Sequence, residues 1–278
     1  RLGSDQTVQG VLPRIDLSGL HVVRGVDHGP RLTIRQLMYQ TSGLADYYEG
    51  GVAGDVIRSR DHAYDLRQVL DWTRTRAPQA APDSGRASYS DTNYQLLGAI
   101  IEAVTDMPYG DAIQARICAP LGLTRTALFD ANRDGDGRSL PVYHKTRRLH
   151  ISRILSSMGP DGGILSDTSD LMTFLRAFMQ GRLFRPENLP SLRQWQRLNF
   201  PLHYGGGLMR FGLPGWMTLW QPSPELIGHS GASGSFAFHA VDHDIFLTGT
   251  FNQTDAPKRP FNFLLKVLKT IETHGGRA

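Results

Sequence analysis

The sequence predicts an α+β fold in which helices come first, short strands follow and one helix closes the chain. Up to about residue 181, apolar residues recur at helical spacing, as in the run Leu171, Phe174, Leu175 and Phe178. After Pro201 the pattern changes to short apolar runs separated by Gly, Pro and Asp. Because separate runs of helices and strands are typical of α+β proteins, we expect an antiparallel sheet.

The composition is that of an ordinary folded protein. The 278 residues suffice for one large domain or two smaller ones, and 40% are hydrophobic and 20% charged. No run of about 18 apolar residues occurs, so we expect no membrane span. The first residues lack the layout of a signal peptide and an initiator Met, so they leave the compartment open, with a periplasmic or secreted location slightly favoured. Cys118 is the only cysteine, which excludes an internal disulfide.

The charge pattern does not favour a nucleic-acid partner. The net charge is +4 and the pI is near 9.3, but basic residues are spread along the chain, and the densest cluster is Lys145, Arg147 and Arg148. No zinc spacing, aromatic RNA-binding motif or heptad repeat accompanies them, so we expect a solvated basic surface. We also expect no cofactor and no metal, because five histidines have no spacing typical of ligands: His144, His150, His203, His239 and His243.

The helical half can be predicted element by element. Residues 1–32 are rich in Gly and Pro and are expected to be irregular. Thr33 and Gln36 have the spacing of a capping box, which starts a short helix that Gly43 ends. A second helix is expected over 65–76, followed by a loop over 77–88. Further helices are expected over 92–105 and 109–118, the first with four inward residues, Leu97, Ile100, Ile101 and Val104.

The second half begins with an expected long excursion over 130–163, which is rich in Asp, Gly and Arg. Asp167 or Ser169 is expected to cap the next helix, and Gly181 to end it. Four short strands are expected, over 208–211, 217–220, 235–238 and 245–248. An amphipathic helix is expected over about 260–273.

Five segments carry a resemblance to a known family. Tyr89-Ser90-Asp91 opens the segment 89–98, and His229-Ser230-Gly231 lies about 140 positions later within 228–234. The other three segments are 33–44, which ends in Gln-Thr-Ser-Gly-Leu, 120–123 and 161–166. In this order they resemble the serine β-lactamase and penicillin-binding-protein-like hydrolases. The family members that these segments resemble include class C β-lactamases, esterases and D-amino-acid peptidases.

The resemblance implies a single β-lactamase-like domain over 1–278. We expect a mainly helical lobe over 33–200, and an antiparallel sheet with the C-terminal helix over 201–278. The family's nucleophile motif, Ser-x-x-Lys, occurs nowhere: the residues three before the four lysines are Val142, Asp255, Phe263 and Lys266. We therefore expect an N-terminally incomplete copy that lacks the first strands and the nucleophile helix and is inactive as given.

By resemblance, Tyr89 corresponds to the tyrosine that shares proton transfer with the motif lysine. A phenol of ordinary pKa near ~10 acts as a base only beside cations. The alternative for Tyr89 is a structural hydrogen bond. Asp91 stands where many relatives have asparagine, whose amide both donates and accepts, whereas an ionised carboxylate only accepts. The alternative for Asp91 is a helix N-cap.

His229 replaces the lysine of the family's Lys-Thr-Gly motif. An imidazole of ordinary pKa near ~6.5 is mostly neutral at pH 7 and binds anions weakly, which favours esters, small amides or D-amino-acid peptides over β-lactams. Gly231 would let a substrate lie along the strand edge, with Ser230 lining the cleft. By resemblance, the Ala232 amide would be one of two oxyanion donors.

Two functions follow from these motifs. The first is a serine hydrolase whose partner is a small-molecule acyl substrate. The alternative is a non-catalytic protein that binds cell-wall or D-amino-acid ligands. An α/β-hydrolase elbow at Ser230 is disfavoured because a strand pattern, not a helix, follows this serine. The oligomeric state is left open.

Overall fold

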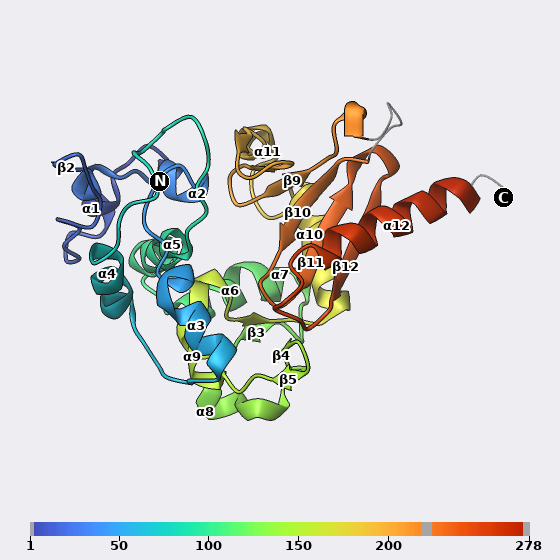
Figure 1. Ribbon diagram of the computed structural model, residues 1–278, viewed down its shortest axis with the longest axis horizontal. Helices are drawn as coiled ribbons and strands as arrows, with labels where there is room; N and C mark the ends of the chain where they lie inside the picture. Colours follow the sequence, from blue (N-terminus) through green and yellow to red (C-terminus); the bar gives the residue numbers. More distant parts are fainter. Residues whose placement is uncertain (1–2, 218–223, 275–278) are drawn as a thin grey trace.

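A computed structural model describes residues 3–217 and 224–274. A helical region lies beside a six-stranded sheet, and the C-terminal helix packs on that sheet (Figure 1). The predicted α+β class and antiparallel sheet are confirmed, since every neighbouring strand pair in this sheet is antiparallel.

The sheet has the strand order β12-β11-β10-β9-β8-β7. Its strands are β7 Gln196–Arg197, β8 Leu202–Tyr204, β9 Met209–Phe211, β10 Leu226–Ser230, β11 Ser235–Ala240 and β12 Ile245–Thr250. Adjacent residues of β10 point to opposite faces of the sheet. Leu226 therefore joins a core with Leu264 of α12 (Arg259–His274), whereas Ile227 joins one with Leu175 of α10 (Thr168–Met179). One helix thus covers each face.

Three of the four predicted strands lie at β9, β11 and β12. For the fourth, predicted over 217–220, Met217 instead ends the short 3-10 helix η7 (Gly215–Met217), and 218–220 lie outside the described residues. The four predicted strands also omitted β10, which contains His229. They omitted β7 and β8 as well, because two and three residues are too short for a period-2 pattern.

The helical region contains α2 Ile34–Met38, α3 Ala53–Arg58, α4 Leu66–Arg74, α5 Asp91–Thr105, α6 Tyr109–Ile113 and α7 Ala119–Leu121, with π-helical turns η2 Tyr48–Val52 and η3 Gln114–Cys118. The capping box at Thr33 and Gln36 is confirmed, and Asp65 and Gln68 form a second one. The predicted end of the first helix is wrong. The helix stops at Met38, because Gln40 takes a left-handed conformation with φ 57°.

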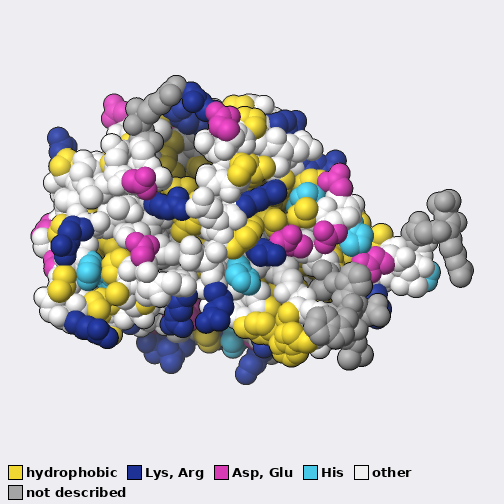
Figure 2. Space-filling model, turned by 90° about the horizontal axis from the view of Figure 1, so that it is seen from above, with side chains coloured by type: hydrophobic (Ala, Val, Ile, Leu, Met, Phe, Trp, Pro, Cys, Tyr) yellow, Lys and Arg dark blue, Asp and Glu magenta, His cyan; other side chains and the backbone are white. Residues whose placement is uncertain are grey.

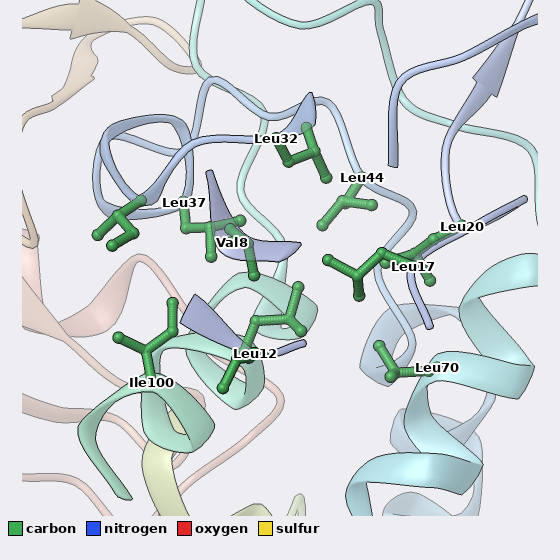
Figure 3. Close-up of a cluster of buried hydrophobic side chains, with 11 residues drawn as sticks. Val8, Leu12, Leu17, Leu20, Leu32, Leu37, Leu44, Leu70 and Ile100 are labelled. Carbon is green, nitrogen blue, oxygen red and sulfur yellow. The ribbon is translucent and has the colours of Figure 1, made fainter. Parts of the chain in front are cut away.

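The core of this region corrects two further predictions. Residues 3–32 are only partly irregular: between turns and coil they form α1 Val8–Val11, the hairpin β1 Val22–Val23 and β2 Val26–Asp27, and η1 Gly29–Arg31. Their leucines converge on Leu70 of α4 and Ile100 of α5 (Figure 3). The predicted inward face of α5 is partly wrong, since Val104 is 50% exposed, whereas Leu96 is fully buried.

The predicted excursion over 130–163 is structured. It contains α8 Ala131–Asp134, η4 Gly135–Gly137, β4 Tyr143–His144, β5 Arg147–Arg148, α9 Ser152–Met158 and η5 Gly159–Asp161. Just outside it, β3 Ala127–Leu128 pairs with β6 Ile164–Leu165. Asp167 caps α10, as predicted, and Gly181 follows this helix with φ 68°. Between α10 and β7 lie η6 Pro186–Asn188 and α11 Leu189–Leu192, and η8 Val241–His243 connects β11 to β12.

The distribution of charged side chains on the surface agrees with the predicted spread of basic residues. On the face shown in Figure 2, Lys and Arg side chains are scattered among acidic and apolar ones and form no continuous basic stripe. Within the described ranges, no helix is both long and apolar enough to cross a membrane.

Candidate active site

The start of α5 is fixed by a buried polar network from the segment 40–44. The Gln40 side-chain oxygen accepts hydrogen bonds from the Ser90 backbone N–H at 2.9 Å and from the Asn93 side-chain amide. Ser42 Oγ donates to the Asn93 side-chain oxygen at 2.7 Å. Gln40, Ser42, Ser90 and Asn93 are all fully buried. Because these buried hydrogen bonds join the segment 40–44 to the start of α5, they hold the Tyr89-Ser90-Asp91 turn in one position, although Gln40 Nε2 has no hydrogen-bond partner among the described residues.

Asp91 is not the N-cap of α5. Ser90 occupies that position, without a side-chain capping bond, and Asp91 is the first helical residue. Burial raises the pKa of the Asp91 carboxyl well above its usual range, and the nearby charges of Asp161 and Asp46 raise it further. A carboxyl that keeps its proton at neutral pH can donate one hydrogen bond and accept others, as an asparagine amide does.

Asp46 and Asp161 complete an acidic cluster around Asp91. One oxygen of Asp46 accepts from the backbone N–H groups of Tyr48 at 3.0 Å and Asp91 at 3.3 Å. One oxygen of Asp161 accepts from the Tyr47 hydroxyl at 2.6 Å. Burial raises the pKa of Asp46 to about 6 and that of Asp161 to about 7. Asp46 was missed in the sequence. Asp161 could be noticed only as part of a motif, because nothing local places either carboxyl beside Asp91.

Tyr89 lies against His229 despite their distance in sequence. Their ring centroids are 6.2 Å apart, and Tyr204 and Tyr94 lie 5.8 Å and 6.1 Å from the Tyr89 ring. Burial raises the pKa of the Tyr89 phenol well above its ordinary value, and the Asp91 charge acts in the same direction. Tyr89 therefore holds its proton at neutral pH and can donate a hydrogen bond.

His229 is the penultimate residue of β10, and both of its ring nitrogens have partners. Nε2 lies 3.1 Å from the Tyr204 hydroxyl, and Nδ1 lies 2.9 Å from the Ser230 carbonyl oxygen. Burial lowers the pKa of the His229 imidazole to about 4, only partly offset by the hydrogen bond to Ser230. At neutral pH the ring is therefore uncharged, and it is no substitute for a lysine as an anion-binding cation.

The turn after β10 offers a free backbone donor. The Gly231 N–H donates to the Ser235 carbonyl at 2.9 Å, and the Gly234 N–H donates to Gly231 at 2.9 Å. Within the described part of the chain, the exposed Ala232 N–H donates to no protein acceptor. Ser230 Oγ instead approaches the Met209 sulfur at 3.8 Å, which leaves no base beside this hydroxyl.

An open cavity of about 500 Å³ lies beside Tyr89, bordered mainly by the start of η2 and the segment 76–79. Its lining includes Asp46, Glu49, Arg76 and Gln79, whereas His229 does not line it. The Arg76 guanidinium lies across Gly50, where an added Cβ would be 2.2 Å from the guanidinium carbon. The cavity therefore combines one cation with two carboxyl groups.

A sequence profile of the Beta-lactamase family matches residues 1–269. The chain belongs to the beta-lactamase family. Penicillin-binding protein 4* of Bacillus subtilis (strain 168) is 28% identical over 236 residues, which cover 76% of this chain and 49% of that protein. The chain thus spans about half the length of this curated relative.

Solved structures of family relatives agree with the fold. A D-stereospecific amidohydrolase from Streptomyces sp. is 29% identical with a TM-score of 0.74, over 91% of this chain and 76% of that one. The D-amino acid amidase from Ochrobactrum anthropi SV3 has a TM-score of 0.76 at 22% identity, over 97% of this chain and 79% of that one. At this identity the second likeness concerns the fold alone.

Two features limit what the site can contain. The family's Ser-x-x-Lys motif is absent from the 278 residues. Across the described residues, no group of three or more His, Cys, Asp or Glu side chains is arranged to hold a metal ion. Among the described residues, the site therefore offers hydrogen-bond donors, carboxyl groups and one imidazole.

Proposed function

We propose that this protein is a serine hydrolase of the beta-lactamase family that acts on esters, small amides or D-amino-acid peptides through an acyl-serine ester. The observation that carries the proposal is the contact between Tyr89 and His229, which brings two separated family motifs to a ring distance of 6.2 Å. The name of the 29%-identical relative, a D-stereospecific amidohydrolase, supports this substrate class.

In the proposed site, each residue has a chemical role. The Tyr89 phenol, protonated at neutral pH, passes its proton to the leaving group and takes up the proton that the attacking serine hydroxyl loses, so it ends the acylation step protonated. The Asp91 carboxyl hydrogen-bonds the substrate carbonyl in its neutral form, as an amide would. The free Ala232 N–H supplies one donor to the developing oxyanion, a contact worth about 3 kcal/mol in other serine hydrolases. β10 lies between β9 and β11, but its pairing with β9 ends at Gly228, so His229 and Ser230 extend past β9 and Ser230 borders the cleft.

The neutral His229 favours substrates without a carboxylate at the β10 end of the site. Transfer of a carboxylate to a partly buried position without a cationic partner costs several kcal/mol. Esters and amides avoid this cost, whereas β-lactams carry such a carboxylate. The cavity beside Tyr89 is then the place for the acyl group of the substrate.

The test is acylation of the protein produced from the full reading frame of its gene. We expect labelling by a fluorophosphonate and turnover of p-nitrophenyl esters, with much slower turnover of nitrocefin. Tyr89→Phe is expected to slow ester turnover about a hundredfold or more. Tyr143→Phe, a control whose hydroxyl has no hydrogen-bond partner among the described residues, leaves turnover unchanged. A folded protein that showed no labelling and no turnover would rule out the proposal.

A non-catalytic binding protein is the second candidate. The absence of Ser-x-x-Lys from the 278 residues favours it. In that case the cavity beside Tyr89 would bind a cell-wall fragment or a D-amino-acid compound without reaction. The full reading frame separates the two functions, because the gene of a binding protein would lack Ser-x-x-Lys. In that case, N-acetyl-D-alaninamide would raise the melting temperature of the protein without being hydrolysed.

A further inference from the structure

Tyr204 connects the candidate site to the core, although the proposed function gives it no role. It comes from β8, and its side chain is fully buried. Its hydroxyl lies 3.1 Å from His229 Nε2 and also hydrogen-bonds the hydroxyl of Tyr94, from α5. A helix, a strand and the His229 ring thus meet at one phenol oxygen.

The hydrogen bonds around His229 fix the direction of every proton in this group. The Ser230 carbonyl can only accept, so the Nδ1 atom, 2.9 Å away, must carry a hydrogen. In a neutral imidazole, Nε2 then has a lone pair and accepts from the Tyr204 hydroxyl. Because Tyr204 gives its only hydrogen to Nε2, its oxygen must accept the hydrogen of Tyr94. The Ser230 carbonyl therefore places the hydrogen on Nδ1, and the Tyr204 hydroxyl then donates to Nε2 while Tyr94 donates to Tyr204.

We propose that Tyr204 is a positioning residue that holds His229 in the Nδ1–H tautomer, and that Tyr94 orients the Tyr204 hydroxyl. This positioning role depends on the proposed hydrolase function in one respect: His229 must belong to the active site. The rings that face His229 are those of Tyr204 and Tyr89, at 5.8 Å and 6.2 Å. Of these two tyrosines, Tyr204 is the one whose hydroxyl hydrogen-bonds the imidazole.

This arrangement has a consequence for substrate choice. While Tyr204 donates to Nε2 and Ser230 accepts from Nδ1, the His229 ring has no spare hydrogen for a substrate carboxylate. The ring can donate from Nε2 only if it is protonated and the Tyr204 hydroxyl turns away. Tyr204 thereby holds the His229 imidazole in one orientation and in its uncharged form at the edge of the site.

The test is the nitrogen-15 NMR spectrum of the histidine side chains in the full chain, with the His229 signals assigned from His229→Gln. At pH 7 we expect a protonated Nδ1 and an unprotonated, hydrogen-bonded Nε2. The opposite pattern, with hydrogen on Nε2, would overturn the proposal. This measurement needs no turnover, so its failure is separate from a failure of the acylation test.

Variants then assign the effect to Tyr204. Tyr204→Phe removes the donor to Nε2, and we expect the tautomer ratio to shift about fivefold toward Nε2–H, as loss of one hydrogen bond predicts. Tyr94→Phe keeps the donor and should give a smaller shift. Tyr143→Phe in β4, where the hydroxyl has no hydrogen-bond partner among the described residues, should give none. A Tyr204→Phe protein with a native amide spectrum and an unchanged ratio would refute the positioning role.

Discussion

Asp91 illustrates how the environment changes the chemistry of one residue. As an ionised carboxylate it could only accept hydrogen bonds, which suits the site poorly where many relatives have asparagine. Burial and the carboxyls of Asp161 and Asp46 keep its pKa well above the usual range. The raised pKa favours the neutral form of the carboxyl, which can donate one hydrogen bond and accept others as an amide does.

This interpretation predicts that Asp91→Asn is nearly silent in ligand binding. At pH 7 we expect the dissociation constant of N-acetyl-D-alaninamide, measured by calorimetry, to change less than about threefold. Asp91→Ala removes the hydrogen bond and should weaken binding about fivefold. Equal weakening by both substitutions would show that the ionised carboxylate, not the neutral one, contacts the ligand.

At the residue scale, the motifs indicated Tyr89 and His229 but not their surroundings. A family resemblance could place these two residues in one site. Tyr204 and Asp46 could not be found in this way, because their importance depends on contacts across more than 20 positions in sequence. The strongly lowered pKa of His229 likewise depends on burial, which the sequence does not reveal.

At the scale of elements, local chemistry predicted helix starts better than helix ends. The predicted caps at Thr33 and Asp167 are short-range hydrogen bonds, and both are present. The cap at Asp65, which was not predicted, is of the same kind. The end of α2 is set by tertiary contacts: Gln40 leaves the helix because its side chain serves the buried network at Asn93. The two-residue strands have no periodicity to detect and form only through their partners.

A glycine in α5 gives a prediction at this scale. Gly98 faces Pro160, and an added Cβ would lie 2.1 Å from the Pro160 Cγ. Alanine favours a helix by about 1 kcal/mol over glycine, but forced overpacking costs typically 1–3 kcal/mol. We therefore expect Gly98→Ala to lower the free energy of unfolding measured with urea.

Gly54 in α3 is the matched control for Gly98. An added Cβ there would meet only the far end of the Arg58 side chain, at 2.9 Å, and this flexible chain can move. We expect Gly54→Ala to raise stability by up to about 1 kcal/mol. If both substitutions stabilised the protein equally, the close packing of α5 on Pro160 would be wrong.

At the scale of the whole molecule, the buried acidic cluster makes stability depend on pH. Burial raises the folded-state pKa values of Asp46 and Asp161 to about 6 and about 7, above the usual 3.8. The folded state thus binds more protons than the unfolded state between about pH 4 and 7. Stability is lost as pH rises through this window.

His229 acts in the opposite direction and at lower pH. Its folded-state pKa is lowered to about 4 from 6.5, so the unfolded state binds more protons between these values. Stability from this group is lost as pH falls below about 6.5. Above pH 6.5 the carboxyls are therefore alone in setting the slope, and we expect the melting temperature to fall between pH 6 and pH 8.

Asp161→Asn tests the origin of this slope. The amide can still accept from Tyr47 through its oxygen, but it cannot ionise beside Asp46 and Asp91. We expect this variant to gain about 1–2 kcal/mol more stability at pH 8 than at pH 6, measured by urea unfolding. Asp5→Asn, which changes an exposed carboxylate, should leave the pH slope of the wild type intact. A slope that persists undiminished in Asp161→Asn would show that Asp161 does not set it and that another buried group, such as Asp46, does.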